Sequence, residues 1–267
     1  MHSRFARLNV AAAVALAAVA AGFPSVSQAA SGPSSLDYEA TILADHPFIY
    51  WRLDDTTGSG QMADASGNGN VGVYSNSPSP ILERDSLING DSDPSVRFAT
   101  NSYATWEPGS QAYSGPFSVE AWIETGRNAG EHTFFSTRSA ADLSFDLKLS
   151  TQVQGRGIRV DVGDGSTRWF VTETVPFKWR DNTRYAVVAV ATNFRVTIYV
   201  DGAPIGSVRY TDAIGRKPLL FDYSHVPQVG MTNGYQFFSG RIDELAVYEY
   251  ALSADQVTNH FQAGIAP

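Results

Sequence analysis

The chain has 267 residues, with 19 basic and 27 acidic side chains, a formal net charge of −8 and no cysteine. Because cysteine is absent, neither disulfides nor thiolate metal sites can stabilise the fold. The acidic balance argues against nucleic acid and anionic membrane surfaces as partners, whereas neutral glycans and divalent cations remain compatible with it.

The first 29 residues have the features of a secretory signal peptide. Arg4 and Arg7 give a basic start, residues 10–23 form an apolar run, and residues 27–29 fit a small-x-small cleavage site. The apolar run is shorter than the roughly 20 residues that a membrane-spanning helix needs, and no later segment is long enough. We therefore expect a secreted, extracellular protein without a membrane span. Removal of the signal leaves 238 residues, with 17 basic against 27 acidic side chains and hence a net charge of −10.

The mature chain is predicted to be a short linker at residues 30–35 followed by one domain at residues 36–267. Its length falls within the range of roughly 200 to 250 residues that a single β-sandwich can fill. Glycine, proline, serine, asparagine and aspartate recur between short alternating segments, a pattern typical of a many-stranded antiparallel fold. The sequence therefore predicts an all-β domain.

The first predicted element is a helix at residues 36–45, which stops before Pro47 because helical geometry is disfavoured in front of proline. A second helix is predicted after Ser253, which forms a capping box with Gln256, and Gly264 can end it. Between these helices, strands are predicted at residues 49–53, 95–98, 117–123, 133–136, 144–150, 158–162, 169–174, 185–191, 194–200, 203–208 and 240–248. The dipeptide Asp201-Gly202 favours a tight hairpin between two of them.

Five segments carry a family resemblance: Ile49-Tyr50-Trp51-Arg52-Leu53-Asp54, residues 64–70, residues 117–123, Tyr199-Val200-Asp201-Gly202 and residues 240–252. In this order the chain resembles, over about residues 36–263, the laminin-G-like, concanavalin A-like domains of secreted bacterial proteins. The resemblance implies a two-sheet antiparallel jelly-roll sandwich with short terminal helices. It indicates much less about activity, since this fold hosts lectins, carbohydrate-binding modules, glycoside hydrolases, lyases and adhesion domains.

One candidate metal site follows from an oxygen-rich loop. Asp64, Ser66 and Asn68, followed by Gly69, imitate the first half of an EF-hand calcium loop, with oxygen ligands at alternate positions. The second half does not fit, because Ser75 stands where a bidentate glutamate is required. The residues therefore leave a calcium site of another type open.

The family resemblance implies a structural Ca²⁺ held by this loop and by the acidic residue of the last strand. The predicted ligands are the carboxylates of Asp64 and Asp243, with Gly67, Asn68 and Asn70 completing the shell. The alternative is a solvated turn of asparagine, aspartate and glycine, with Asp243 in a purely structural role.

Aromatic side chains are the main candidates for ligand binding, because sugar rings stack on exposed tryptophan and tyrosine. Trp169 beside Arg168, together with Trp179, Trp106 and Tyr113, lies in or next to turn-rich segments and could form such a platform. Packing of these rings in the interior is the alternative, and for Trp169 and Trp179 the two are equally favoured.

Three carboxylates lie in two of the patterned strands. Glu120 shares a face with Trp122 and could line a concave ligand surface, although an exposed or hydrogen-bonded structural carboxylate is the simpler alternative. Trp51 and Trp122 themselves are expected in the core or under a loop. Asp243 and Glu244 are adjacent, so on a regular strand they point to opposite faces and cannot flank one glycosidic bond.

The favoured function is non-catalytic recognition of an extracellular carbohydrate by stacking and hydrogen bonds to sugar hydroxyls. One alternative is a glycoside hydrolase or polysaccharide lyase whose acids come from different strands, and another is a protein-protein adhesion domain. No catalytic residue is assigned, because the sequence contains neither a Gly-x-Ser-x-Gly elbow nor a zinc-binding histidine pattern. The glycan and the oligomeric state stay open.

Overall fold

A computed structural model describes residues 37–76, 78–99, 101–106, 112–125, 131–137, 146–150, 157–162, 171–210, 220–222 and 227–267. The predicted signal peptide and linker lie outside these residues. Within the described part of the chain, no helix is long and apolar enough to cross a membrane.

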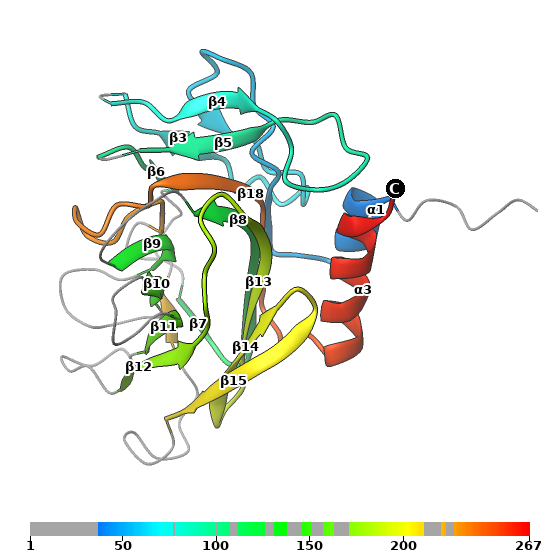
Figure 1. Cartoon of the computed structure of the whole chain (residues 1–267), viewed down its shortest axis with the longest axis vertical. Coiled ribbons are helices and arrows are strands. Elements are labelled where there is room, and N and C mark those ends of the chain that lie inside the picture. The colour runs from blue at the N-terminus through cyan, green and yellow to red at the C-terminus, as the bar shows by residue number, and fades with distance from the viewer. Residues whose placement is uncertain are drawn as a thin grey trace, which may run out of the picture. The chain divides into compact units, whose positions relative to one another are not determined.

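The described strands form two main antiparallel sheets, which confirms the predicted sandwich (Figure 1). The first, here called the helix-covered sheet, runs in the order β15 (Ala203–Arg209), β14 (Arg195–Val200), β13 (Arg184–Ala191), β8 (Phe117–Thr125), β18 (Gly240–Tyr248), β5 (Ser95–Phe98) and β4 (Ile81–Arg84), with β1 (Ile49–Trp51) also paired to β18. The second sheet runs β12 (Val171–Pro176), β11 (Gly157–Val162), β10 (Asp146–Ser150), β9 (Glu131–Ser136), β17 (Gln228–Val229), β6 (Ala104–Thr105), β3 (Gly72–Tyr74) and β2 (Gln61–Met62). A small additional pair consists of β7 (Ala112–Ser114) and β16 (Leu220–Asp222).

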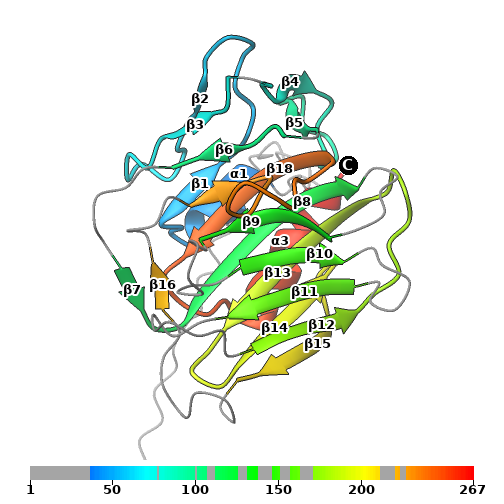
Figure 2. The same ribbon diagram turned by 90° about the vertical axis from the view of Figure 1, so that its left-hand side faces the viewer.

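The main core lies between the two sheets and follows the alternation predicted from the sequence. On β8, Phe117, Val119, Ala121 and Ile123 are all buried in this core. Trp51 of β1 is also fully buried there, as expected. Figure 2 shows the strands β9 to β12 of the second sheet in front of the helix-covered sheet.

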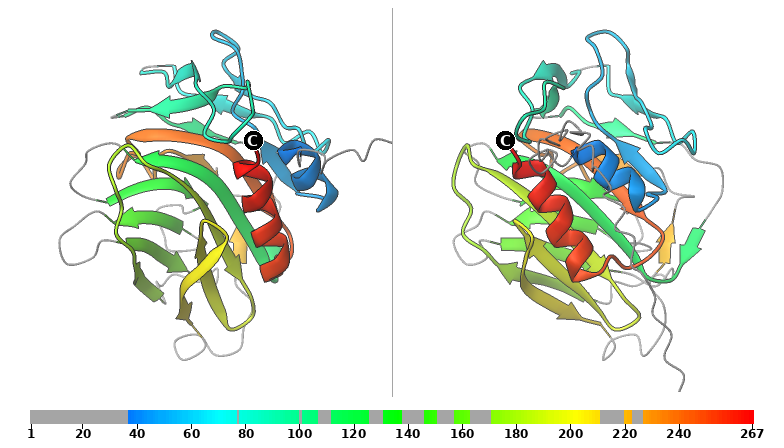
Figure 3. Two further views of the ribbon diagram at one scale, coloured as in Figure 1. Left: turned by 45° about the vertical axis from the view of Figure 1, so that its right-hand side comes forward. Right: turned by 90° about the vertical axis from the view of Figure 1, so that its right-hand side faces the viewer.

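Helices α1 (Tyr38–Ala44) and α3 (Ala254–Ile265) cover the other face of the first sheet (Figure 3). Asp37 caps α1 by accepting a hydrogen bond from the Ala40 N–H, and Ser253 begins α3 with the predicted capping box. Beneath the helices, Trp122 stacks on Phe261 with ring centroids 6.0 Å apart. A second buried cluster therefore lies on the helix side of the sheet, in addition to the core between the sheets.

A β-bulge in β18 corrects one expectation about the two carboxylates of this strand. The register to β8 shifts between Asp243 and Ala246, and Glu244 has a positive φ of 52°. As a result Ile242 and Leu245 both lie in the core between the sheets, whereas Asp243 and Glu244 both face the helix side. The two adjacent carboxylates therefore share one face, which a regular strand would not allow.

Most strand positions agree with the sequence, and β18 has the predicted bounds. The hairpin between β14 and β15 turns at Asp201 and Gly202, whose φ angles of 50° and 75° are the positive values that a type I′ turn requires. Predicted strand residues 144–145 and 169–170 lie outside the described part of the chain. Short strands such as β2, β6 and β17 were not predicted, because two residues carry no readable alternation.

Candidate functional site

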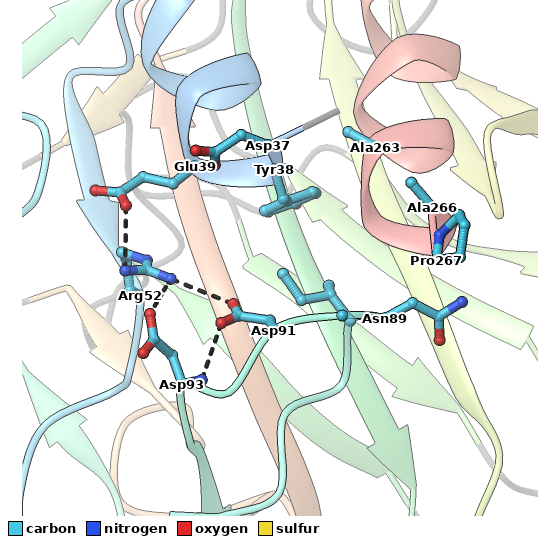
Figure 4. Close-up of a pocket in the computed structure, with 12 residues that line it drawn as sticks. Asp37, Tyr38, Glu39, Arg52, Asn89, Asp91, Asp93, Ala263, Ala266 and Pro267 are labelled. Atoms are coloured by element: carbon cyan, nitrogen blue, oxygen red, sulfur yellow. Dashed lines mark hydrogen bonds and ion pairs between the residues drawn. The ribbon is translucent and has the colours of Figure 1, made fainter. Parts of the chain in front are cut away.

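A pocket of about 340 Å³ opens where α1, the end of α3 and the segment after β4 come together (Figure 4). Its volume lies within the range of roughly 300 to 1,000 Å³ that is common for ligand pockets. We call it the Arg52 pocket, and its lining residues are Asp37, Tyr38, Glu39, Arg52, Ile88, Asn89, Gly90, Asp91, Asp93, Ala263, Ala266 and Pro267. Segments from both ends of the domain therefore build one concave surface.

The guanidinium group of Arg52 organises this pocket. Its carboxylate partners, with the nitrogen-oxygen distances, are Glu39 (3.3 Å), Asp54 (3.4 Å), Asp91 (3.3 Å), Asp93 (2.5 Å) and Glu244 (3.4 Å). Burial acts to lower the pKa of Arg52, but the negative charges around it, with Glu244 first, raise that pKa above its usual value. Arg52 is therefore a permanent cation surrounded by an excess of negative charge.

Beneath the pocket lies the buried pair of Asp243 and Glu244, each only 1 % exposed. Asp243 accepts hydrogen bonds from the Leu87 N–H at 2.8 Å and from the Ser86 hydroxyl at 3.2 Å, and Glu244 accepts one from the Tyr50 hydroxyl. Burial raises the pKa of both carboxyls, and for Glu244 the neighbouring charge of Asp243 adds to the shift. These contacts fix the turn that leads into the wall of the pocket.

The Asp64 loop, predicted as one half of a calcium site, is closed by hydrogen bonds. Asp64 Oδ1 accepts from the N–H groups of Tyr50 and Ser66, each at 3.0 Å. Its Oδ2 accepts from the Ser66 hydroxyl at 2.8 Å and from the Asn70 N–H at 2.7 Å. The side-chain amides of Asn68 and Asn70 both donate to the carbonyl of Phe48. These hydrogen bonds tie the loop to the start of β1, because Asp64 accepts from Tyr50 and the two asparagines donate to Phe48.

In this arrangement the two predicted carboxylate ligands are both engaged in hydrogen bonds within the protein. Asp64 accepts four hydrogen bonds, which use lone pairs that a cation would need. Asp243 instead accepts from Ser86 and Leu87. Among the described residues, no group of three or more histidine, aspartate or glutamate side chains could hold a metal ion. Gly67, with a φ of 83°, allows the loop to turn. Calcium binding by this loop stays a prediction.

A thermal melt with and without a chelator tests the calcium prediction. If Ca²⁺ holds the Asp64 loop, excess EDTA lowers the unfolding midpoint and added CaCl₂ restores it, because a ligand of the native state stabilises by mass action. Magnesium chloride is the matched control for ionic strength. An unfolding midpoint that does not change in EDTA would contradict calcium binding and would mean that hydrogen bonds alone hold the Asp64 loop.

Two members of the predicted sugar platform are packed inside the protein. Trp106 is 4 % exposed and contacts Trp51 edge to face at 6.2 Å, while Trp179 is 8 % exposed and contacts Phe177 at 4.8 Å. The indole N–H of Trp179 donates to the Gly157 carbonyl at 2.9 Å. Since neither ring presents a face to solvent, the structure corrects the expectation of a stacking role, and core packing describes both residues.

The other predicted binding residues do not gather around one site either. Tyr113 is half-buried and donates its hydroxyl hydrogen bond to the Glu249 carbonyl. Trp169 and Arg168 lie outside the described residues, so their role as a platform stays a prediction. Glu120 does not line an open surface, because it is 3 % exposed beneath α3.

Glu120 instead belongs to a buried contact that joins strand and helices. His260 of α3 lies between Glu120 Oε2 at 3.0 Å and Asp45 Oδ2 at 2.8 Å, and the Tyr248 hydroxyl donates to Glu120. Burial acts to lower the pKa of His260, but the two carboxylates, with Glu120 first, raise it to about 9. At neutral pH a charged imidazolium therefore connects β8, α3 and the end of α1.

This contact predicts a pH-dependent stability. Because the folded pKa of His260 is about 9 against an ordinary value of 6.5, its stabilisation is complete below about pH 6.5 and is lost as the pH rises through about 9. At about 1.36 kcal/mol per pKa unit, we expect a loss of at most about 3 kcal/mol. Urea unfolding at pH 6, 8 and 10 should show this fall in the wild type and a much smaller one in His260→Gln. An equal fall of the unfolding free energy with pH in the wild type and in His260→Gln would contradict this role of His260.

The comparisons with known proteins agree with this architecture. Residues 98–258 match the model of a laminin G family described as the concanavalin A-like lectin/glucanases superfamily. Domain 4 of AbnA, a GH43 extracellular arabinanase from Geobacillus stearothermophilus solved with arabinotriose, is similar in structure, with a TM-score of 0.62 and 20 % identity over 80 % of this chain and 97 % of that one. No curated protein sequence matches the chain.

Botulinum neurotoxin domains are also similar in structure. The serotype D ligand binding domain in complex with N-acetylneuraminic acid has a TM-score of 0.57 and 12 % identity, and the serotype G binding domain has 0.56 and 14 %. The chain aligns over 84 % and 80 % of its own length, but it spans only 52 % and 50 % of those two domains. At such identities the likeness shows the fold alone. The family match covers more than half of the chain, and the chain therefore belongs to the concanavalin A-like lectin/glucanases superfamily.

Proposed function

We propose that this chain is an exported carbohydrate-binding domain that recognises a neutral glycan at the Arg52 pocket. The observation that carries the proposal is the lining of this pocket, where carboxylates, one guanidinium and the carboxamide of Asn89 surround a concave space beside Tyr38 and Ile88. The carboxylates that Arg52 holds in place have further lone pairs, which can accept hydrogen bonds from sugar hydroxyls. Export rests on the signal-like residues 1–29.

The charges of the pocket indicate which sugars it would accept. Glu39, Asp91 and Asp93 outnumber the one cation, Arg52, so a sugar that carries its own carboxylate would be repelled. A neutral sugar presents only hydroxyl groups and avoids this repulsion. The similar arabinanase domain was solved with arabinotriose, a neutral sugar, which makes arabinotriose a suitable first ligand to test here.

The described residues offer no comparable support for glycoside hydrolysis. That reaction needs two carboxyl groups on either side of the scissile bond, one of them protonated. Asp243 and Glu244 are the adjacent carboxyls with a raised pKa, but at 1 % exposure they cannot touch a substrate. Their burial favours a structural role beneath a binding pocket.

Binding measurements with pocket variants test the proposal. A glycan array of neutral plant, algal and bacterial oligosaccharides, with arabinotriose and N-acetylneuraminic acid included, should show binding to neutral members only. Asp93→Ala and Glu39→Gln remove carboxylates that are 39 % and 41 % exposed, so both variants should fold and bind the hit at least about ten-fold more weakly. Glu173→Gln, at an exposed position on β12, is the control. Wild-type affinity in both pocket variants would remove the Arg52 pocket as the site.

A further inference from the structure

A second concave surface lies away from the charged pocket, between the turn that precedes β2 and the start of β4. It is a groove of about 480 Å³, larger than the Arg52 pocket. Its described lining residues are Thr57, Gly58, Gly60, Tyr74, Ser75, Asn76, Ser79, Pro80, Ile81 and Leu82. Since β2 and β4 are the outermost strands of their sheets in the described part of the chain, the groove lies at the open edge of the sandwich.

The groove differs from the Arg52 pocket in its chemistry. Among the described residues, its lining contains no aspartate, glutamate, lysine or arginine, in a chain whose formal charge is −8. One part offers the hydroxyl and carboxamide groups of Ser79 and Asn76, and another offers the apolar side chain of Ile81 next to the buried Pro80. Ile81 is 49 % exposed, which leaves a large part of this apolar side chain open to a ligand. Such a lining suits an uncharged molecule with one hydroxyl-rich and one apolar face.

Two glycines leave part of the groove lining without side chains. Gly58 and Gly60 have φ angles of +92° and +67°, and no atom lies within 4 Å of the place where a Cβ would stand on either residue. Because these φ values are strained for other residues, glycine keeps this wall free of side chains. A flat ring can therefore approach the chain closely at this point.

Hydrogen bonds within the protein hold the walls of the groove in place. The Tyr74 hydroxyl donates to Asp55 at 2.7 Å, and the Tyr74 N–H donates to the Gly60 carbonyl at 3.0 Å. The Ser75 hydroxyl donates to the Pro78 carbonyl at 2.8 Å and accepts from the Tyr103 N–H at 3.1 Å. A preformed site loses little conformational entropy on binding, which favours a true ligand site over a surface irregularity.

We propose that this groove is a second binding site for a neutral sugar, with hydroxyls facing Asn76 and Ser79 and the C–H face of the ring lying on Ile81. The ligand class rests on the proposed function, whereas the location is independent of it. The loop that follows β4 forms a wall of the Arg52 pocket, and the start of β4 forms the groove. One polysaccharide could thus be held at two points by the same hairpin, which increases its apparent affinity.

Isothermal titration with arabinotriose and maltotriose, two neutral trisaccharides, tests the second site. We expect two binding events in the wild type for at least one of them, and only one in Ile81→Asp, which places a charge on the apolar wall. Val73→Asp is a matched control, because Val73 is also 49 % exposed but does not line the groove. Asn76→Ala, at an exposed position, provides a second variant with little risk to folding and should weaken the same event about ten-fold.

The results separate this site from the Arg52 pocket. Loss of one event in Ile81→Asp and of the other in Asp93→Ala supports both sites. Loss in Ile81→Asp alone, with Asp93→Ala unchanged, supports the groove and removes the pocket. Wild-type stoichiometry and affinity in both Ile81→Asp and Asn76→Ala would overturn the groove as a sugar site. An equal loss of binding in the control Val73→Asp would also overturn it. So would a single binding event in the wild type that only Asp93→Ala abolishes.

Discussion

Replacement of Arg52 by methionine is expected to lower the free energy of unfolding by about 3 to 5 kcal/mol, a typical cost for breaking a buried ion pair from one side. The guanidinium is the shared partner of five carboxylates, among them Glu244, which is 1 % exposed. Methionine fills a similar volume but leaves this negative charge uncompensated. The expected loss is therefore electrostatic and not a packing effect.

Urea unfolding of Arg52→Met measures this loss, and Arg195→Met is the matched control. Arg195 is exposed on β14, so the same substitution there should change stability by less than about 0.5 kcal/mol. Adding Glu244→Gln to Arg52→Met removes the buried charge and should restore part of the stability. If Arg52→Met were as stable as Arg195→Met, Arg52 would not be needed to compensate the charge of the carboxylates around it.

Replacement of Trp122 by alanine is expected to cost about 3 to 5 kcal/mol, as for other large buried aromatic residues. Trp122 is 2 % exposed, stacks on Phe261 of α3 and donates its indole N–H to the Tyr38 hydroxyl at 3.1 Å. It also lies directly under Gly264, where an added Cβ would stand only 2.4 Å from the indole ring. Both helices therefore dock on this one side chain.

The unfolding midpoint in urea checks this result, with Tyr235→Ala as the control. Tyr235 is 45 % exposed, so its loss should have little effect. Trp122→Ala should also bind the glycan more weakly, because Tyr38 and the end of α3 line the Arg52 pocket. A cost below about 1 kcal/mol would mean that the helices are held by other contacts.

Local features of the fold could be predicted from the sequence because their signals are local. The strand at residues 240–248, the capping box at Ser253 and the Asp201-Gly202 turn each depend on residues close together in the chain. All three are present in the structure. The family resemblance is confirmed as well, since it rested on the order of several such local segments.

The candidate site could not be predicted in the same way. Its carboxylates come from residues 37–39 and 91–93, its cation is Arg52, and its rim includes residues 263–267. These segments meet only in the folded protein, so no spacing in the sequence marks them. One weak signal was available, namely a charged side chain between the buried Trp51 and Leu53. The bulge that brings Asp243 and Glu244 to one face has no sequence signature either.

Burial of the tryptophans shows a further limit of sequence patterns. Trp106 and Trp179 lie in turn-rich segments, where an aromatic ring can either cover the core or face solvent. Neighbours distant in the chain decide between the two: Trp106 packs against Trp51, and the indole N–H of Trp179 donates to the Gly157 carbonyl. An aromatic residue near a turn is therefore weak evidence for a sugar platform until its exposure is known.

The most direct test of the proposed function compares a neutral oligosaccharide with its uronic acid counterpart of the same length by titration calorimetry. If the Arg52 pocket selects its ligand by charge, the wild type binds the neutral sugar at least about ten-fold more tightly, and Asp93→Ala reduces that preference. Equal affinity for the two sugars, or tighter binding of the uronic acid, would contradict neutral glycan recognition at this pocket.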